Sequence, residues 1–215
     1  MLVEEVNLLR KPIKPYDLIP VLSYILLLGR CRHCKHKISV RYPLIELLTG
    51  ALYALVYLRF GITASFWIGI ILMSVLVIVA MIDIDTMEIY DRFHIIILVL
   101  GIINLFLSDL HPMNFIIGFF IISIPFFILA YLTGGIGGGD IKLIAVAGLL
   151  LGYAPTLVAF LIASISGGIV AVVLVLMKLE TRKSLIAFGP FLCVGIAIAY
   201  LYGSQIIQWY IALIT

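Results

Sequence analysis

The sequence predicts an all-α, polytopic membrane protein with about six or seven transmembrane helices joined by short cytoplasmic loops. The first observation is composition: 64% of the 215 residues are hydrophobic and 12% are charged. Soluble domains have about 45–50% apolar and about 25% charged residues. The second is that the apolar residues form continuous runs close to the length of about 20 residues that spans a bilayer. The third is that these runs do not alternate apolar with polar residues, which argues against transmembrane strands.

The same numbers exclude several other classes of protein. One core of this size could not bury so much apolar surface, which excludes a soluble domain. Three cysteines are too few for a secreted disulfide scaffold, and the hydrophobicity excludes intrinsic disorder. A net charge of +3 gives no indication of nucleic-acid binding.

The predicted elements follow the apolar runs in order. A first stretch, Leu18–Leu28, contains Pro20 and is too short to span, so we interpret it as an interfacial or re-entrant helix. The fifth span reaches bilayer length only if Asp140 and Lys142 lie at its border, and Gly203-Ser204-Gln205 is a candidate break in the long seventh span. The predicted spans are Tyr42–Phe60, Thr63–Ile82, Phe93–Ser108, Met113–Leu132, Ile141–Tyr153, Thr156–Met177 and Ile186–Leu213.

Positive charge predicts the orientation of these spans. Lys and Arg residues gather before the first span, and cytoplasmic segments of membrane proteins are enriched in them. With seven spans, all 14 Lys and Arg residues except Arg59 fall on the cytoplasmic side. We therefore divide the chain into a cytoplasmic or interfacial segment, residues 1–41, and a transmembrane domain, residues 42–215.

This topology places two acidic segments at the same cytoplasmic border. One runs from Asp83 to Arg92, and the other is the glycine-rich run that ends at Asp140. Two carboxylates at a shared site repel each other, so one is protonated while the other is ionised, and the pair can divide acid and base work. The alternatives are a hydrated loop at Asp83–Arg92, and a flexible glycine hinge with Asp140 as a helix N-cap.

Several segments together resemble the type IV prepilin peptidases, membrane aspartic proteases of the GxGD group. Asp83-Ile84-Asp85 followed by Asp91 is similar to the family's first aspartate motif, and Gly137-Gly138-Gly139-Asp140 with Lys142 is similar to the second. The resemblance extends over roughly residues 16–195. The other matching segments are Tyr16–Tyr24, Cys31-Arg32-His33-Cys34, Ile38–Gly50 and Phe188-Gly189-Pro190-Phe191.

The resemblance implies roles for particular residues. It assigns Asp83 and Asp140 to the two catalytic aspartates, which cleave a peptide bond with water and need no cofactor. It implies that the remaining motif residues bind substrate or support the site: Glu46, Asp85, Glu88, Asp91, Gly137, Gly139 and Lys142.

The resemblance also implies substrate and location. The substrates would be prepilins or pseudopilins with a short basic leader, a Gly before the cleaved bond and an apolar helix that stays in the lipid bilayer. The enzyme would be a multi-pass protein of the cytoplasmic (inner) membrane with its aspartates on the cytoplasmic side. Border acids such as Glu46 could attract the basic leader.

Family members usually carry two Cys-x-x-Cys pairs suited to zinc, and N-methylate the new terminus with S-adenosylmethionine. This chain has only Cys31 and Cys34, with His33 and His36 nearby, and Lys11–Pro15 stands where the first pair is expected. We therefore interpret the cysteines as a free thiol pair rather than a zinc site, and expect little methyl transfer.

Two other functions are compatible with the residues. Border carboxylates could relay protons or bind a cation in an ion-coupled transporter. The chain could also be a non-catalytic assembly subunit of a pilus or secretion machine. The clustering of the acids at one border, with none near the middle of a span, favours hydrolysis over transport.

Overall fold

The structure is a computed structural model that describes residues 19–135, 137–177 and 187–214. The chain divides into two compact units, Met1–Ala54 and Leu55–Thr215. Their border falls inside α3 (Arg41–Phe60), a helix that begins where the sequence predicts the transmembrane domain to begin.

The N-terminal unit contains a short helix and a hairpin. The helix, α2 (Leu22–Leu26), has five residues, fewer than the interfacial helix predicted over 18–28, whose first residue lies outside the described ranges. Positive φ angles at Val21 and Leu28 bound it. In the hairpin, Arg30 pairs with Lys37, and the Cys31 N–H donates to the His36 carbonyl at 2.9 Å.

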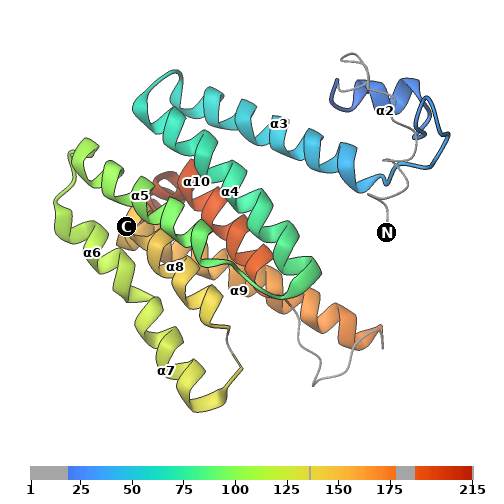
Figure 1. The fold of residues 1–215 in the computed structure, drawn as a ribbon. Coiled ribbons are helices and arrows are strands. Elements are labelled where there is room, and N and C mark those ends of the chain that lie inside the picture. The colour runs from blue at the N-terminus through green and yellow to red at the C-terminus, as the bar shows by residue number, and fades with distance from the viewer. Residues whose placement is uncertain (1–18, 136, 178–186, 215) are drawn as a thin grey trace. The chain divides into compact units, whose positions relative to one another are not determined.

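The second unit is a bundle of helices (Figure 1). The helices are α4 (Ala64–Thr86), α5 (Asp91–Leu107), α6 (Pro112–Ile121), α7 (Ser123–Thr133), α8 (Gly138–Leu151), α9 (Tyr153–Leu176) and α10 (Gly189–Ile214). Within the described part of the chain, five segments are long and apolar enough to cross a membrane: α3, α4, α6 with α7, α9 and α10. The protein is therefore an all-α, multi-pass membrane protein. The two other predicted spans form shorter helices, 17 residues in α5 and 14 in α8.

Helix α8 lies at the centre of the bundle. It packs against α5, α6, α7, α9 and α10, and most of its residues from Leu143 to Leu150 are buried. Gly118 of α6 and Gly148 of α8 face each other so closely that a Cβ on either would collide with the other helix's backbone. Small residues allow such close approach of helices in membranes. The short helix is thus enclosed by its neighbours, and only its N-terminal end carries charge.

Three local predictions from the sequence differ from the structure. Helix α4 continues to Thr86, so Asp83 and Asp85 are helical rather than part of a loop. It ends because Met87 adopts a left-handed conformation, φ 57°, and its N–H donates to the Asp83 carbonyl. Helix α10 is continuous through Gly203, where the missing side chain makes room for Pro155.

The predicted fourth span is divided at Ile122 into α6 and α7. Pro125 explains the interruption, because it has no N–H to donate to the carbonyl four residues earlier. Both halves continue in the same membrane-spanning segment.

Candidate active site

The last turn of α4 carries a buried carboxylate. Asp83 is 5% exposed, and its Oδ2 atom has no hydrogen-bond partner among the described residues. The backbone of Gly189, at the start of α10, lies directly against this carboxylate. A buried polar atom without a partner is costly and indicates a functional rather than a structural role.

The second predicted aspartate lies at the opening of α8. Asp140 is the third residue of the helix, not its N-cap, because the helix begins at Gly138 and Gly137 is the N-cap. The positive end of the helix dipole still favours a carboxylate in this turn. The side chain is half-buried and precedes the apolar stretch that begins at Ile141.

Asp83 and Asp140 interact electrostatically. Burial and, as the smaller cause, the charge of Asp83 together raise the pKa of Asp140 to about 7. Helices α4 and α8 come from distant parts of the sequence, and both pack against α5 and α10. A carboxyl that titrates near neutral pH beside a second carboxylate can share one proton with it, which is the arrangement that acid–base catalysis by a pair of aspartates requires.

Ile89 separates two glycines beside the aspartates. An added Cβ at Gly139, the residue before Asp140, would lie 3.0 Å from the Ile89 Cβ. At Gly189, which touches Asp83, it would lie 3.2 Å from the Ile89 Cδ1. The absence of side chains at these glycines therefore lets the α4–α5 connection pack closely against both aspartate-bearing regions.

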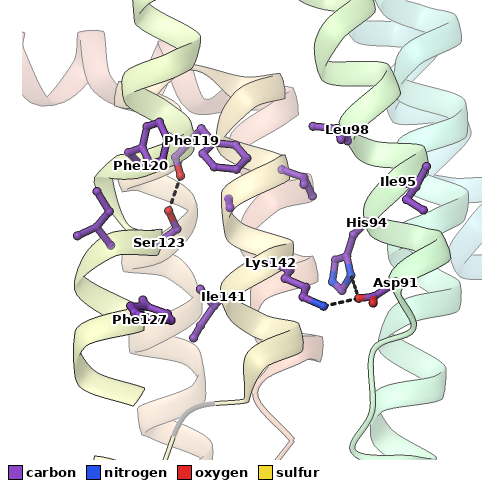
Figure 2. A pocket seen from close by; sticks show the side chains of 13 residues that line it. Asp91, His94, Ile95, Leu98, Phe119, Phe120, Ser123, Phe127, Ile141 and Lys142 are labelled. Atoms are coloured by element: carbon purple, nitrogen blue, oxygen red, sulfur yellow. Dashed lines mark hydrogen bonds and ion pairs between the residues drawn. The ribbon is translucent and has the colours of Figure 1, made fainter. Parts of the chain in front are cut away.

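A polar cluster joins α5 to α8 beside this site (Figure 2). The Lys142 ammonium donates to Asp91 Oδ1 at 2.7 Å, and this bond lowers the pKa of Asp91. The His94 ring lies between Asp91 and the backbone of α8: its Nδ1 is 3.4 Å from Asp91 Oδ1, and its Nε2 is 3.1 Å from the Gly139 carbonyl oxygen. The pair Asp91–Lys142 therefore belongs to a structural cluster, with Lys142 on the turn that carries Asp140.

The cluster lies at one end of an apolar groove of about 570 Å³ between α5, α6, α7 and α8. Figure 2 shows Ile95 and Leu98 on one wall and Phe119, Phe120 and Phe127 on the opposite side. Asp83 and Asp140 are not among its lining residues. The groove is thus separate from the aspartate pair.

The other predicted site residues lie in different parts of the structure. Gly137 approaches Asp140, since a Cβ there would be 3.3 Å from Asp140 Oδ2. Asp85 and Glu88 are exposed near the end of α4. Glu46 belongs to the N-terminal unit, where its Oε2 accepts a 2.8 Å hydrogen bond from the Val21 N–H.

The sequence does not identify two residues near the site, His94 and Ile89. His94 begins an apolar run like an interfacial residue, yet it is 5% exposed and contacts Gly139 in the first turn of α8. Its spacing of three residues from Asp91 is the signal that could have identified it, because such residues share a helix face. For Ile89, the residue type gives no comparable indication that it lies beside the aspartates.

The cysteine hairpin carries the two candidate zinc ligands, Cys31 and Cys34. Cys31 and Cys34 are reduced, and no group of three or more His, Cys, Asp or Glu able to hold a metal occurs among the residues described. The hairpin lines a cavity of about 510 Å³ with Leu27, Leu28, Arg30, Cys31, Arg32 and Lys35.

Comparison with known proteins gives consistent matches. A model described as "Type IV leader peptidase family" matches residues 70–172, which include both Asp83 and Asp140, and "Bacterial Peptidase A24 N-terminal domain" matches residues 8–60. The prepilin leader peptidase/N-methyltransferase of Bacillus subtilis (strain 168) is 35% identical over 207 residues, covering 94% of this chain and 82% of the relative.

Proteins from other bacteria give similar matches. The proteins of the same name from Aeromonas salmonicida and Legionella pneumophila are 33% and 32% identical over 210 and 206 residues. These matches cover 94% and 93% of this chain, and 72% of each relative. No solved structure matches the chain.

Proposed function

This chain belongs to the type IV leader peptidase family, and from this premise we propose that it is an aspartic endopeptidase that removes the leader of prepilins or pseudopilins. The observation that carries the proposal is the buried, unpartnered Oδ2 of Asp83 within electrostatic range of Asp140. The relatives' names favour hydrolysis over an ion-coupled transporter or a non-catalytic assembly subunit.

The chemistry uses the single proton that the two carboxylates share. The ionised carboxylate takes a proton from water while the resulting hydroxide bonds to the carbon of the scissile carbonyl. The protonated carboxyl donates to the carbonyl oxygen and stabilises the charge that develops there. Collapse of the tetrahedral intermediate breaks the C–N bond, and a proton passes to the leaving amine. The pair titrates together, so either aspartate can begin as the base.

The substrate and its orientation belong to the same proposal. We infer a substrate with a basic leader, cleaved after Gly, whose apolar helix remains in the bilayer. The positive-inside pattern supports a site at the cytoplasmic face of the inner membrane. Ile89, in the short α4–α5 connection, packs against Gly139 before Asp140 and against Gly189 beside Asp83, which supports placing both aspartates at one border.

The relatives' names also include N-methyltransferase. S-adenosylmethionine would supply a methyl group for the new N-terminus. The proposed reaction is peptide hydrolysis, and methyl transfer to the new N-terminus is a second activity that the relatives' names support.

The test uses purified full-length protein and a synthetic prepilin with a basic leader, a Gly and an apolar helix. Asp83→Asn and Asp140→Asn should each reduce the cleavage rate by about 100-fold or more, in the range that acid–base groups contribute. Asp109→Asn is the matched control, because Asp109 is an exposed carboxylate after the other end of α5. Full cleavage by both active-site variants would contradict the aspartyl mechanism.

A further inference from the structure

Helix α5 contacts α8 on both sides of Asp140. Before the aspartate, His94 reaches the Gly139 carbonyl at 3.1 Å. After it, Lys142 donates to Asp91 at 2.7 Å. Figure 2 shows His94 and Lys142 converging on Asp91 from the two helices. The turn of α8 that holds Asp140 is therefore fixed to α5 at two points.

The acceptor at Gly139 determines the protonation of the histidine. A carbonyl oxygen can only accept, so the His94 Nε2 must carry a hydrogen and donate it. Nδ1 lies 3.4 Å from Asp91 Oδ1 and makes no hydrogen bond within the described part of the chain. Because His94 is 5% exposed, water cannot readily replace its bond to Gly139.

This attachment connects the two aspartates. Helix α5 begins at Asp91, immediately after the short connection that follows α4, where Asp83 lies. A bond from the first turn of α5 to Gly139 therefore restrains Asp140 with respect to Asp83. The glycine-rich segment before α8 has little intrinsic stiffness, so this restraint has to come from a neighbouring element.

The same two helices provide an internal comparison at their other ends. Asn104, near the end of α5, donates its Nδ2–H to the Leu150 carbonyl of α8 at 2.9 Å. Both bonds run from an α5 side chain to an α8 carbonyl. Only the His94 bond adjoins an aspartate of the proposed pair.

We propose that His94, through its bond to the Gly139 carbonyl, is a positioning residue that holds Asp140 in register with Asp83 for catalysis. This inference rests on the proposed peptidase function. His94 acts through the Gly139 carbonyl and does not touch the substrate. Its contribution is to the geometry of the aspartate pair, so it should affect turnover more than substrate binding.

The experiment compares His94→Phe, His94→Gln and Asn104→Leu in the purified full-length protein. His94→Phe removes the donor and should lower kcat by about 10–100-fold with KM nearly unchanged, as expected for a small misplacement of a catalytic group. His94→Gln keeps an N–H donor and should recover part of kcat. Asn104→Leu removes the comparable distant bond and should keep kcat.

Hydrogen exchange provides a readout that does not depend on activity. Amides near Gly139–Asp140 should exchange faster in His94→Phe, whereas in Asn104→Leu the faster exchange should lie near Leu150. If His94→Phe fails to fold, His94→Leu, which also lacks a donor, takes its place in the comparison with Asn104→Leu. Unchanged exchange and kcat in the folded His94 variants would overturn the inference.

The outcome separates this inference from the proposed function. If Asp140→Asn abolishes cleavage and the His94 variants match the wild type, the positioning role is wrong while the peptidase function stands. If Asp140→Asn cleaves normally, the aspartyl mechanism fails regardless of His94. Faster exchange with unchanged kcat would show a structural bond only and would also overturn the positioning role.

Discussion

Gly189 lies against Asp83 so closely that a Cβ at Gly189 would be 2.5 Å from Oδ2 and 2.9 Å from Cγ of the carboxylate. The first residue of α10 thus forms one wall of the space around Asp83. No side chain fits there unless the carboxylate moves. The position of the aspartate is therefore set by α10 as well as by its own helix.

Gly189→Ala should displace Asp83 and lower the cleavage rate at least about tenfold, and overpacking should destabilise the protein by about 1–3 kcal/mol. Cleavage kinetics and thermal unfolding of the purified protein measure the two effects. Gly168→Ala is the control, because a Cβ at this α9 position meets nothing within 4 Å. Equal activity of the two variants would show that Gly189 does not restrict Asp83.

Cleavage should decrease as pH rises through about 7. The pKa of Asp140 is raised to about 7, so above this pH the carboxyl loses its proton and the pair loses the single shared proton that the mechanism needs. The pH profile of kcat for the synthetic prepilin measures this alkaline limb. A rate that stays constant from pH 6 to 9 would contradict it.

Asp83→Asn should lower the pKa of Asp140, because it removes the negative charge that opposes ionisation. The pKa should remain above its ordinary value, since burial is the larger cause. The infrared C=O band of the protonated carboxyl, followed against pH, measures this shift without requiring activity. Asp140→Asn identifies the band by its loss.

The helices were largely predictable because membrane spans are long, continuous apolar runs. The sequence located α3, α4, α9 and α10 to within a few residues at most ends. The end of α4 was harder to predict. The charges of Asp83 and Asp85 suggested a loop, whereas the helix continues to Thr86 and ends at Met87. Charged residues can extend a helix beyond the bilayer border, so hydropathy alone does not mark its last residue.

The site was predictable in part. Asp83 and Asp140 could be paired in advance because the predicted topology places both at one border, and their catalytic role stays a prediction. The bond from His94 to Gly139 depends on how α5 is rotated against α8, which a uniformly apolar helix does not reveal. Ile89 packs against Gly139 and Gly189, which are distant from it in the sequence, so no local sequence pattern predicts these contacts.

Acids at the cytoplasmic border that the sequence predicts should assist capture of a basic leader. Neutralising Glu46, Asp85 and Glu88 with Gln, Asn and Gln should raise KM severalfold, since exposed ion pairs contribute about 0.2–1 kcal/mol each. The effect should decrease at high salt and vanish for a substrate whose leader lysines are replaced by glutamine. Unchanged KM in the triple variant would exclude attraction of the leader by these acids.

The contact between Gly139 and Ile89 predicts a specific rescue. In Gly139→Ala the new Cβ would lie 3.0 Å from the Ile89 Cβ, so the turn before Asp140 must shift and cleavage should decrease about tenfold, consistent with a small misplacement of the aspartate. Ile89→Ala leaves the Cβ in place but removes the outer atoms that hold the side chain against Gly189, so the connection can yield. The double variant should therefore cleave faster than Gly139→Ala alone, and kcat in a double-mutant cycle measures the coupling. Additive losses would show that Gly139 acts through backbone flexibility rather than through contact with Ile89.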